Sequence, residues 1–142
     1  MENIIKFDGG ILAAHDKPSK LVFLLHGYGD NGNNFINIAQ NLSIENTNSN
    51  FYALNAPSYV DQFLSGRQWF NLYPNGISFE DAGPEEIEII KKDCLNSLVY
   101  IKKNIREICT RFKLEYEDCF ILGFSQGAMM AFELGKYLNK KL

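Results

Sequence analysis

Gly123-Phe124-Ser125-Gln126-Gly127 is the stretch on which the organisation of this chain depends. It follows the apolar run 119–122, which is typical of a strand buried on both faces, and precedes apolar residues at helical spacing. The pattern predicts a sharp strand-to-helix turn that lifts the serine hydroxyl clear of the sheet. Side chains at the two glycines would collide with the neighbouring strand and helix. A glycine-bounded turn with an ordinary solvent-facing serine is the simpler alternative.

Length and composition predict a single folded domain over residues 1–142, because 46% of the residues are hydrophobic and 13% aromatic. The net charge is −3 with dispersed Lys and Arg, which argues against nucleic acid or an anionic membrane as partner. No apolar run approaches the roughly 20 residues of a membrane span, and no basic region precedes an apolar stretch at the N-terminus. We therefore expect a cytoplasmic protein without a membrane span.

Cysteine and histidine usage gives little basis for a metal site or a bound cofactor. Cys94, Cys109 and Cys119 are odd in number and form no C-x-x-C pair, so we expect buried free thiols. His15 and His26 are the two histidines of the chain, and neither lies in a cluster of ligands. A surface or capping role is the expected one for both.

The order of the predicted elements indicates an α/β fold. We expect an edge hairpin over 3–14 with strands at 3–7 and 11–14, and a central strand at 21–25. Further along the chain the patterns predict a helix at 33–43, a strand at 51–54, an ordered loop region or short helix at 57–83, and one long helix at 84–112. This alternation predicts a mostly parallel sheet with flanking helices and a site at the carboxyl ends of its strands.

A glycine-rich loop after the central strand allows two functional interpretations. Gly27, Gly29 and Gly32 match the G-x-G-x-x-G pattern of a dinucleotide-binding module, which also needs an acidic residue after the next strand. That strand is instead followed by Asn55-Ala56-Pro57. In acyl-transfer chemistry, such a loop supplies a backbone N–H to an oxyanion, together with the N–H after the nucleophile. A plain glycine turn is a third possibility.

Scattered aromatic residues occupy the region 57–83. Trp69 and Phe70 are the candidates for lining an apolar acyl pocket. The alternative is that they anchor a long loop to the core, as aromatic residues commonly do.

Three motifs together resemble a known family. LLHGYGD at 24–30, GRQWF at 66–70 and LGFSQGAMMA at 122–131 are similar to the α/β-hydrolase family of small carboxylesterases, phospholipase-like esterases and acyl-protein thioesterases. The resemblance implies a serine hydrolase of carboxylic esters or thioesters, with a small acyl ester or thioester as substrate. Ser125 would be its nucleophile, and the backbone N–H groups of Tyr28 and Gln126 its oxyanion hole. His26 would shape the turn rather than act as the base.

The family's triad runs in the order Ser, Asp or Glu, then His, and residues 129–142 are mostly needed for the helix after the turn. We therefore expect an incomplete α/β-hydrolase fold without the C-terminal strands, the acid and the base, and with activity very low or lost. The strand before Ser125 would be a sheet edge, open to self-association or to a second chain. A non-catalytic remnant or interaction protein is the alternative class.

Overall fold

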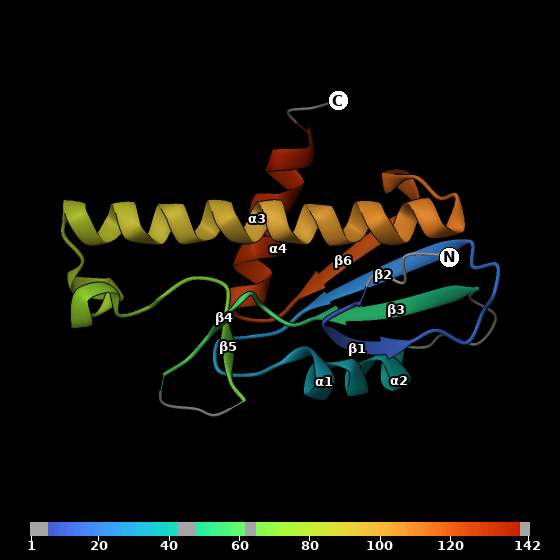
Figure 1. Cartoon of the computed structure of the whole chain (residues 1–142), viewed down its shortest axis with the longest axis horizontal. Helices are drawn as coiled ribbons and strands as arrows, with labels where there is room; N and C mark the ends of the chain where they lie inside the picture. The colour runs from blue at the N-terminus through green and yellow to red at the C-terminus, as the bar shows by residue number, and fades with distance from the viewer. Residues whose placement is uncertain (1–5, 43–47, 62–64, 140–142) are drawn as a thin grey trace.

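The computed structural model describes residues 6–42, 48–61 and 65–139 (Figure 1). The strands are β1 (Gly9–Leu12), β2 (Lys20–Leu25), β3 (Ser49–Leu54), β4 (Ser58–Tyr59), β5 (Arg67–Gln68) and β6 (Cys119–Gly123). The α-helices are α1 (Gly32–Phe35), α2 (Ala39–Leu42), α3 (Pro84–Phe112) and α4 (Gln126–Asn139). Short 3₁₀ turns are η1 (Ile36–Ile38), η2 (Pro74–Gly76), η3 (Phe79–Asp81) and η4 (Tyr116–Asp118).

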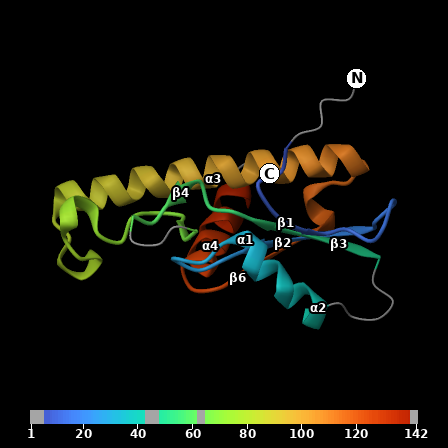
Figure 2. The ribbon, with the colours of Figure 1, turned by 60° about the horizontal axis from the view of Figure 1, so that its bottom comes forward.

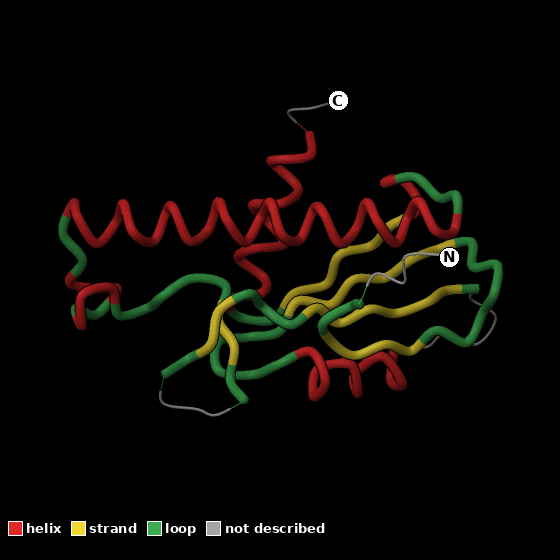
Figure 3. Tube along the Cα trace, in the orientation of Figure 1, coloured by secondary structure: helices red, strands yellow, loops and turns green. Residues whose placement is uncertain are grey.

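A four-stranded sheet in the order β1-β3-β2-β6 forms the centre of the molecule (Figure 3). β2 pairs in parallel with both β3 and β6, whereas β1 runs antiparallel to β3. The predicted α/β class and the central position of the strand at 21–25 are confirmed. Leu25 lies opposite both Leu54 and Gly123, so the three parallel strands β2, β3 and β6 end at the same level. The loops that follow these strands therefore lie together at the carboxyl end of the sheet.

Helices cover the sheet on both faces, as Figure 2 shows with α3 above the strands and α1–α2 beneath them. The alternation of side chains along β2 explains this arrangement. Phe23 and Leu25 face the larger core with α3 and α4, whereas Leu24 faces the smaller core with Ala39. A strand covered on both sides needs apolar residues in succession, which is the pattern of 21–25.

β6 departs from the prediction that its apolar run would be buried on both faces. Cys119 and Ile121 pack against the larger core, but Phe120 is 57% and Leu122 40% exposed on the other face. The short α1–α2 segment packs beneath β2 and β3, and no described element covers the same face of β6. The prediction that this strand is an edge holds for the described residues, since β2 is its one partner.

The predicted N-terminal hairpin is wrong in its pairing. Residues 11 and 12 belong to β1, whose partner is β3 in the register Gly9↔Leu54, while Lys6 and Phe7 are not in a strand. Residues 3–5 lie outside the described part. The Phe7 ring instead packs edge-on against Tyr52 of β3 at a centroid distance of 5.6 Å. The predicted edge position of the strand is correct.

The long helix α3 matches its prediction in both bounds. Pro84 is in its first turn with Glu85 and Glu86 at the positive end of the dipole, and Lys113 ends it with a left-handed φ of 56°. The expected apolar stripe is buried from Leu98 to Ile108, but Phe112 is only partly buried and Ile87 is 42% exposed. Figure 1 shows why, since the first half of α3 extends past the end of the sheet.

The helix predicted at 33–43 is an irregular succession of α1, η1 and α2. Its inner face contains Ala39, Phe35 and Ile38 as expected, while Leu42 is 39% exposed and was wrongly assigned to it. Residues 43–47 lie outside the described part. Within the described ranges, no helix is both long and apolar enough for a membrane span.

Candidate active site

Ser125 occupies the sharp turn that joins β6 to α4. Its φ is +55°, a left-handed conformation that non-glycine residues rarely adopt and that costs of order 1–3 kcal/mol. The carbonyl oxygen of Ser125 accepts the backbone N–H groups of Ala128 at 2.9 Å and Met129 at 3.2 Å, and so starts the helix. The Ser125 side chain is exposed, as the elbow geometry requires.

The two flanking glycines are sterically necessary, as the motif predicted. A Cβ atom at Gly123 would lie 2.3 Å from the carbonyl oxygen of Gly127. A Cβ atom at Gly127 would lie 2.0 Å from the carbonyl oxygen of Leu25 and 2.5 Å from that of His26. Helix α4 therefore contacts the backbone of β2 directly, and this contact fixes Ser125 next to the loop after β2.

The loop after β2 passes beside Ser125, because a Cβ atom at Gly27 would lie 3.4 Å from the Ser125 Cβ. In the described residues, the backbone N–H groups of Tyr28 and Gln126 have no acceptor. The neighbouring loop atoms are paired with β5, since Arg67 accepts the Gly29 N–H at 2.9 Å and donates its own N–H to Asp30 at 2.8 Å. The loop is thus held in place while the Tyr28 N–H stays free.

His26 is fully buried, and the expectation of a surface or capping role for it is wrong. The Ala56 N–H donates to Nε2 at 3.0 Å, so Nδ1 carries the proton and donates it to the carbonyl oxygen of Gly27 at 2.7 Å. Its ring also packs against Trp69 at a centroid distance of 5.2 Å. Burial lowers the pKa of His26 below 6.5, against the raising effects of the Gly27 hydrogen bond and of Asp30. His26 shapes this turn as a neutral side chain.

Acid should therefore destabilise the fold through His26. Protonation places a second donor at Nε2, where it opposes the Ala56 N–H. Because the pKa is lowered in the folded state, the stabilisation is present above pH 6.5 and is lost as the pH falls below that value. We expect the free energy of unfolding in urea to fall between pH 7.5 and 5.5, by up to about 1.4 kcal/mol per pH unit.

The matched variants for this titration are His26→Gln and His15→Gln, because His15 is exposed. His26→Gln should flatten the pH dependence of the free energy of unfolding, whatever the stability of this variant at neutral pH. His15→Gln should show the same pH dependence as the parent. An unchanged slope in His26→Gln would contradict the assignment.

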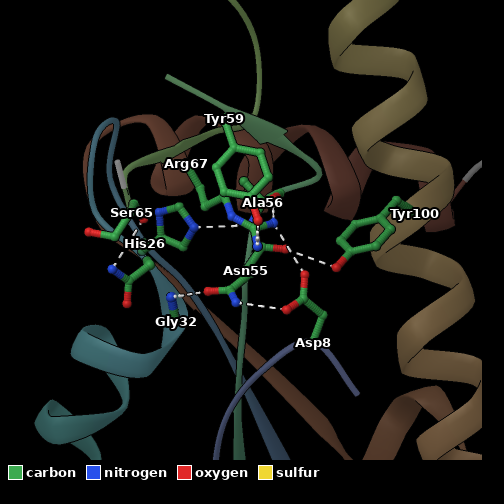
Figure 4. A network of polar contacts seen from close by, with 10 residues as sticks. Asp8, His26, Gly32, Asn55, Ala56, Tyr59, Ser65, Arg67 and Tyr100 are labelled. Carbon is green, nitrogen blue, oxygen red and sulfur yellow. Dashed lines mark hydrogen bonds and ion pairs between the residues drawn. The ribbon is translucent and has the colours of Figure 1, made fainter. Parts of the chain in front are cut away.

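A network of polar side chains supports the loop after β2 (Figure 4). Asn55 accepts the Gly32 N–H at 2.6 Å and donates to Asp8 at 2.9 Å, at the position where a dinucleotide site would have an acid. Arg67 pairs with Asp8 at 3.2 Å and donates to the Ala56 carbonyl at 2.9 Å. The Asn55 side chain of this network therefore occupies the amino end of α1.

The dinucleotide alternative finds little support in this geometry. A pyrophosphate needs free N–H groups at the start of a helix. Here the N–H groups of Gly29, Asp30 and Gly32 all have acceptors within the chain.

Trp69 and Phe70 follow β5 and are held by the side chain of Gln126. The Gln126 Oε1 accepts the Trp69 N–H at 2.7 Å, and Nε2 donates to the Phe70 carbonyl at 2.8 Å. The Trp69 indole donates to the His26 carbonyl at 2.8 Å, and Ser97 donates to the Trp69 carbonyl at 2.5 Å. Trp69 is 1% exposed and anchors its loop to the core, which was the alternative to pocket lining.

An apolar groove of about 800 Å³ starts one helical turn after Ser125. It lies between α3, α4 and the residues after β5. Phe70, Ala128, Met129 and Phe132 line it together with Cys94 and Leu98 of α3. Of the two aromatic candidates, Phe70 lines this groove.

No proton acceptor for Ser125 is found among the described residues. Its hydroxyl has no hydrogen-bond partner there, and both nitrogens of His26 are engaged. The backbone N–H of His15 donates to Asn50 near the start of β3, at the end of the sheet opposite Ser125. The described residues also contain no group of three potential metal ligands.

Sequence reasoning missed the contacts that Gln126 and Arg67 make between distant segments. The Gln126 amide and the Arg67 backbone hold the two loops of the site together. Both residues lie inside the motifs at 66–70 and 122–131, and this position is the sequence signal that points to them.

Comparisons with known proteins agree with this geometry. The family model described as Phospholipase/Carboxylesterase matches residues 9–142. An uncharacterized hydrolase of Schizosaccharomyces pombe is 28% identical over 123 residues, which are 85% of this chain and 48% of the relative. An uncharacterized hydrolase of Mycosarcoma maydis is 29% identical over 116 residues, 82% of this chain and 41% of the relative.

Solved structures show the same fold. The crystal structure of esterase PE8 matches with a TM-score of 0.74 and 28% identity, over 92% of this chain and 58% of that one. A phospholipase/carboxylesterase from Dyadobacter fermentans matches with a TM-score of 0.58 and 16% identity, over 92% of this chain and 55% of that one. The chain thus spans about half the length of the proteins it matches.

Proposed function

The chain belongs to the phospholipase/carboxylesterase family of α/β-hydrolases, and from this membership we propose that it carries the nucleophile and oxyanion hole of a serine hydrolase for carboxylic esters or thioesters. One observation carries the proposal. Ser125 sits at a φ of +55° beside Gly27, in a turn where the N–H groups of Tyr28 and Gln126 have no acceptor within the described residues.

The proposed chemistry begins with attack of the Ser125 hydroxyl on the acyl carbonyl. The bond forms between Ser125 Oγ and the carbonyl carbon, the O–H bond of Ser125 breaks as its proton passes to water, and the negative charge moves to the carbonyl oxygen. The N–H groups of Tyr28 and Gln126 would donate to that oxygen, and the Gln126 N–H lies at the positive end of the α4 dipole. The oxyanion would then re-form the carbonyl, the bond to the leaving oxygen or sulfur would break, and the alcohol or thiol would depart with a proton from water. The acyl group would stay on Ser125 until a water molecule hydrolyses it.

The apolar groove is the proposed place for the acyl part of the substrate. It starts at Ala128 and Met129, in the first turn after the nucleophile, and its lining is mostly apolar. Phe70 contributes to it directly, whereas Trp69 supports it from the core. A small acyl ester or thioester fits this surface better than a charged ligand.

We propose that the described part of the chain hydrolyses esters or thioesters only slowly on its own, because neither histidine can take the Ser125 proton. His26 uses both nitrogens for the loop, and His15 is held at the far end of the sheet. Loss of the base from such a triad costs on the order of a millionfold in turnover. The oxyanion hole and binding alone still give roughly a thousandfold or more over water.

A fluorophosphonate probe tests this proposal. We expect slow, stoichiometric labelling over hours, located at Ser125 by peptide mass spectrometry and absent in Ser125→Ala. Ser58→Ala is the matched control, because Ser58 is an exposed serine in β4, and it should label like the parent. Turnover of p-nitrophenyl butyrate should not differ between the parent and Ser125→Ala.

The other outcomes separate the alternatives. Absent labelling would favour a non-catalytic remnant or interaction protein, and saturable NADH binding would favour the dinucleotide module. Fast hydrolysis that Ser125→Ala abolishes would confirm the nucleophile but contradict the missing base. A rate per chain that rises with protein concentration would indicate that the exposed face of β6 recruits a second chain.

A further inference from the structure

Two cysteine thiols meet at the end of the molecule away from Ser125. Cys109 lies in the last turn of α3 and Cys119 is the first residue of β6, and their sulfur atoms are 3.3 Å apart. We propose that Cys109 and Cys119 form an oxidation-sensitive dithiol that hydroperoxides convert to a disulfide. This inference does not depend on the function proposed for Ser125.

The connection between the two elements holds the thiols together. Lys113 ends α3 in a left-handed conformation, and the Leu114 N–H donates to the carbonyl of Cys109 at 2.9 Å. Glu115 and Asp118 then form a reciprocal capping box around η4, which delivers Cys119 to the sheet. These contacts fix the backbone of both cysteines and so place the two side chains next to each other.

The two sulfur atoms need to approach by only about 1.2 Å to reach the S–S bond length of about 2.05 Å. Both cysteines are free in this structure. Their side chains already point toward each other from a helix end and a strand start, so side-chain rotation rather than rearrangement of the fold would close the bond.

A small pocket gives an oxidant access to the buried thiol. Cys109 lines a cavity of about 420 Å³ together with Arg106, Thr110, Lys113 and Tyr116. Hydrogen peroxide is far smaller than this cavity. The third thiol, Cys94, lies on the same helix but lines the apolar groove instead.

The local electrostatics assign different roles to the two thiols. The hydrogen bond between the two thiols lowers the pKa of Cys109, against burial and the carboxylates of Glu115 and Asp118. The same hydrogen bond and burial raise the pKa of Cys119. Burial and nearby carboxylates raise the pKa of Cys94 to about 11, which makes Cys94 less reactive than Cys109.

The reaction balances with a hydroperoxide as the oxidant. The Cys109 thiolate attacks one peroxide oxygen, the O–O bond breaks, and Cys109 becomes a sulfenic acid while the leaving hydroxide takes a proton to form water. The Cys119 sulfur then attacks the sulfur of Cys109, the S–O bond breaks, and a second water leaves. Overall, two thiols are oxidised and hydrogen peroxide is reduced to two water molecules.

The test treats the folded chain with hydrogen peroxide, denatures it, alkylates the remaining thiols and measures the intact mass. We expect one alkylated thiol in place of three, loss of two hydrogen atoms, a peptide cross-linked between Cys109 and Cys119, and reversal by dithiothreitol. Cys94→Ser is the matched control and should still form the bond.

Cys109→Ser should leave both remaining thiols open to alkylation, whereas Cys119→Ser should form no disulfide and should stop at the sulfenic acid of Cys109. Three alkylatable thiols after treatment, a bond to Cys94, or a cross-link between chains would each overturn the proposal. Peptide mapping of the unsubstituted chain decides the question even where a variant does not fold.

Discussion

Gly127→Ala is expected to destabilise the fold by on the order of 3 kcal/mol or more, enough to unfold a chain of marginal stability. The added methyl group would lie 2.0 Å from the carbonyl oxygen of Leu25 and 2.5 Å from that of His26. Both are backbone atoms at the end of β2, which pairs with β3 on one side and β6 on the other. The strand cannot yield without weakening both ladders, so the helix would have to move away and take Ser125 with it.

Urea denaturation followed by circular dichroism measures this effect, and Gly135→Ala is its control. Gly135 lies in the same helix with nothing within 4 Å of its added Cβ atom. There alanine should stabilise by roughly 0.5–1 kcal/mol, since it costs less backbone entropy than glycine in a helix. Equal stabilities of the two variants would mean that close packing of α4 on β2 does not hold the turn in place.

The elements that the sequence predicts well are those whose signal is local. The stripe of α3, the apolar run of β2 and the glycine-bounded turn at Ser125 each show their environment within a few residues. The elbow glycines could be assigned in advance because their steric role follows from the turn itself. The contact atoms of Gly127, the carbonyls of Leu25 and His26, could not be assigned in advance, because they lie about a hundred residues earlier in the chain.

The predictions that fail depend on contacts between distant segments. The run 119–122 is as apolar as 21–25, yet Phe120 and Leu122 are exposed because the short α1–α2 segment packs only beneath β2 and β3. The hairpin prediction fails for a similar reason. The Asp8 side chain pairs with Asn55 and Arg67, and this fixes β1 against β3.

The candidate site shows the same division. The motifs suffice to propose the hydroxyl of Ser125 and the backbone N–H groups of Tyr28 and Gln126. They do not reveal that the Gln126 side chain is 3% exposed, because its partners Trp69 and Phe70 are more than fifty residues away. A polar residue after the nucleophile looks like a surface residue until the fold is known.

The second large effect is therefore expected at Gln126. Gln126→Leu keeps the approximate volume but removes both hydrogen bonds of the amide, at 2.7 Å to the Trp69 N–H and 2.8 Å to the Phe70 carbonyl. Each buried group left without a partner costs about 1–3 kcal/mol, so we expect a loss of roughly 2–5 kcal/mol in urea denaturation. Gln68→Leu is the control, because that amide donates a single exposed hydrogen bond to Tyr59.

Gln126→Glu separates the hydrogen bonds from simple packing. The carboxylate can still accept the Trp69 N–H, but its other oxygen faces the Phe70 carbonyl, where the amide donated. We expect this variant to be less stable than the parent at neutral pH. Under mildly acidic conditions the difference in free energy of unfolding between this variant and the parent should become smaller, because a protonated carboxyl can donate a hydrogen bond again. A variant as stable as the parent at neutral pH would show that the amide does not hold the residues after β5 against the start of α4. In that case the backbone turn alone would fix the position of the Gln126 N–H.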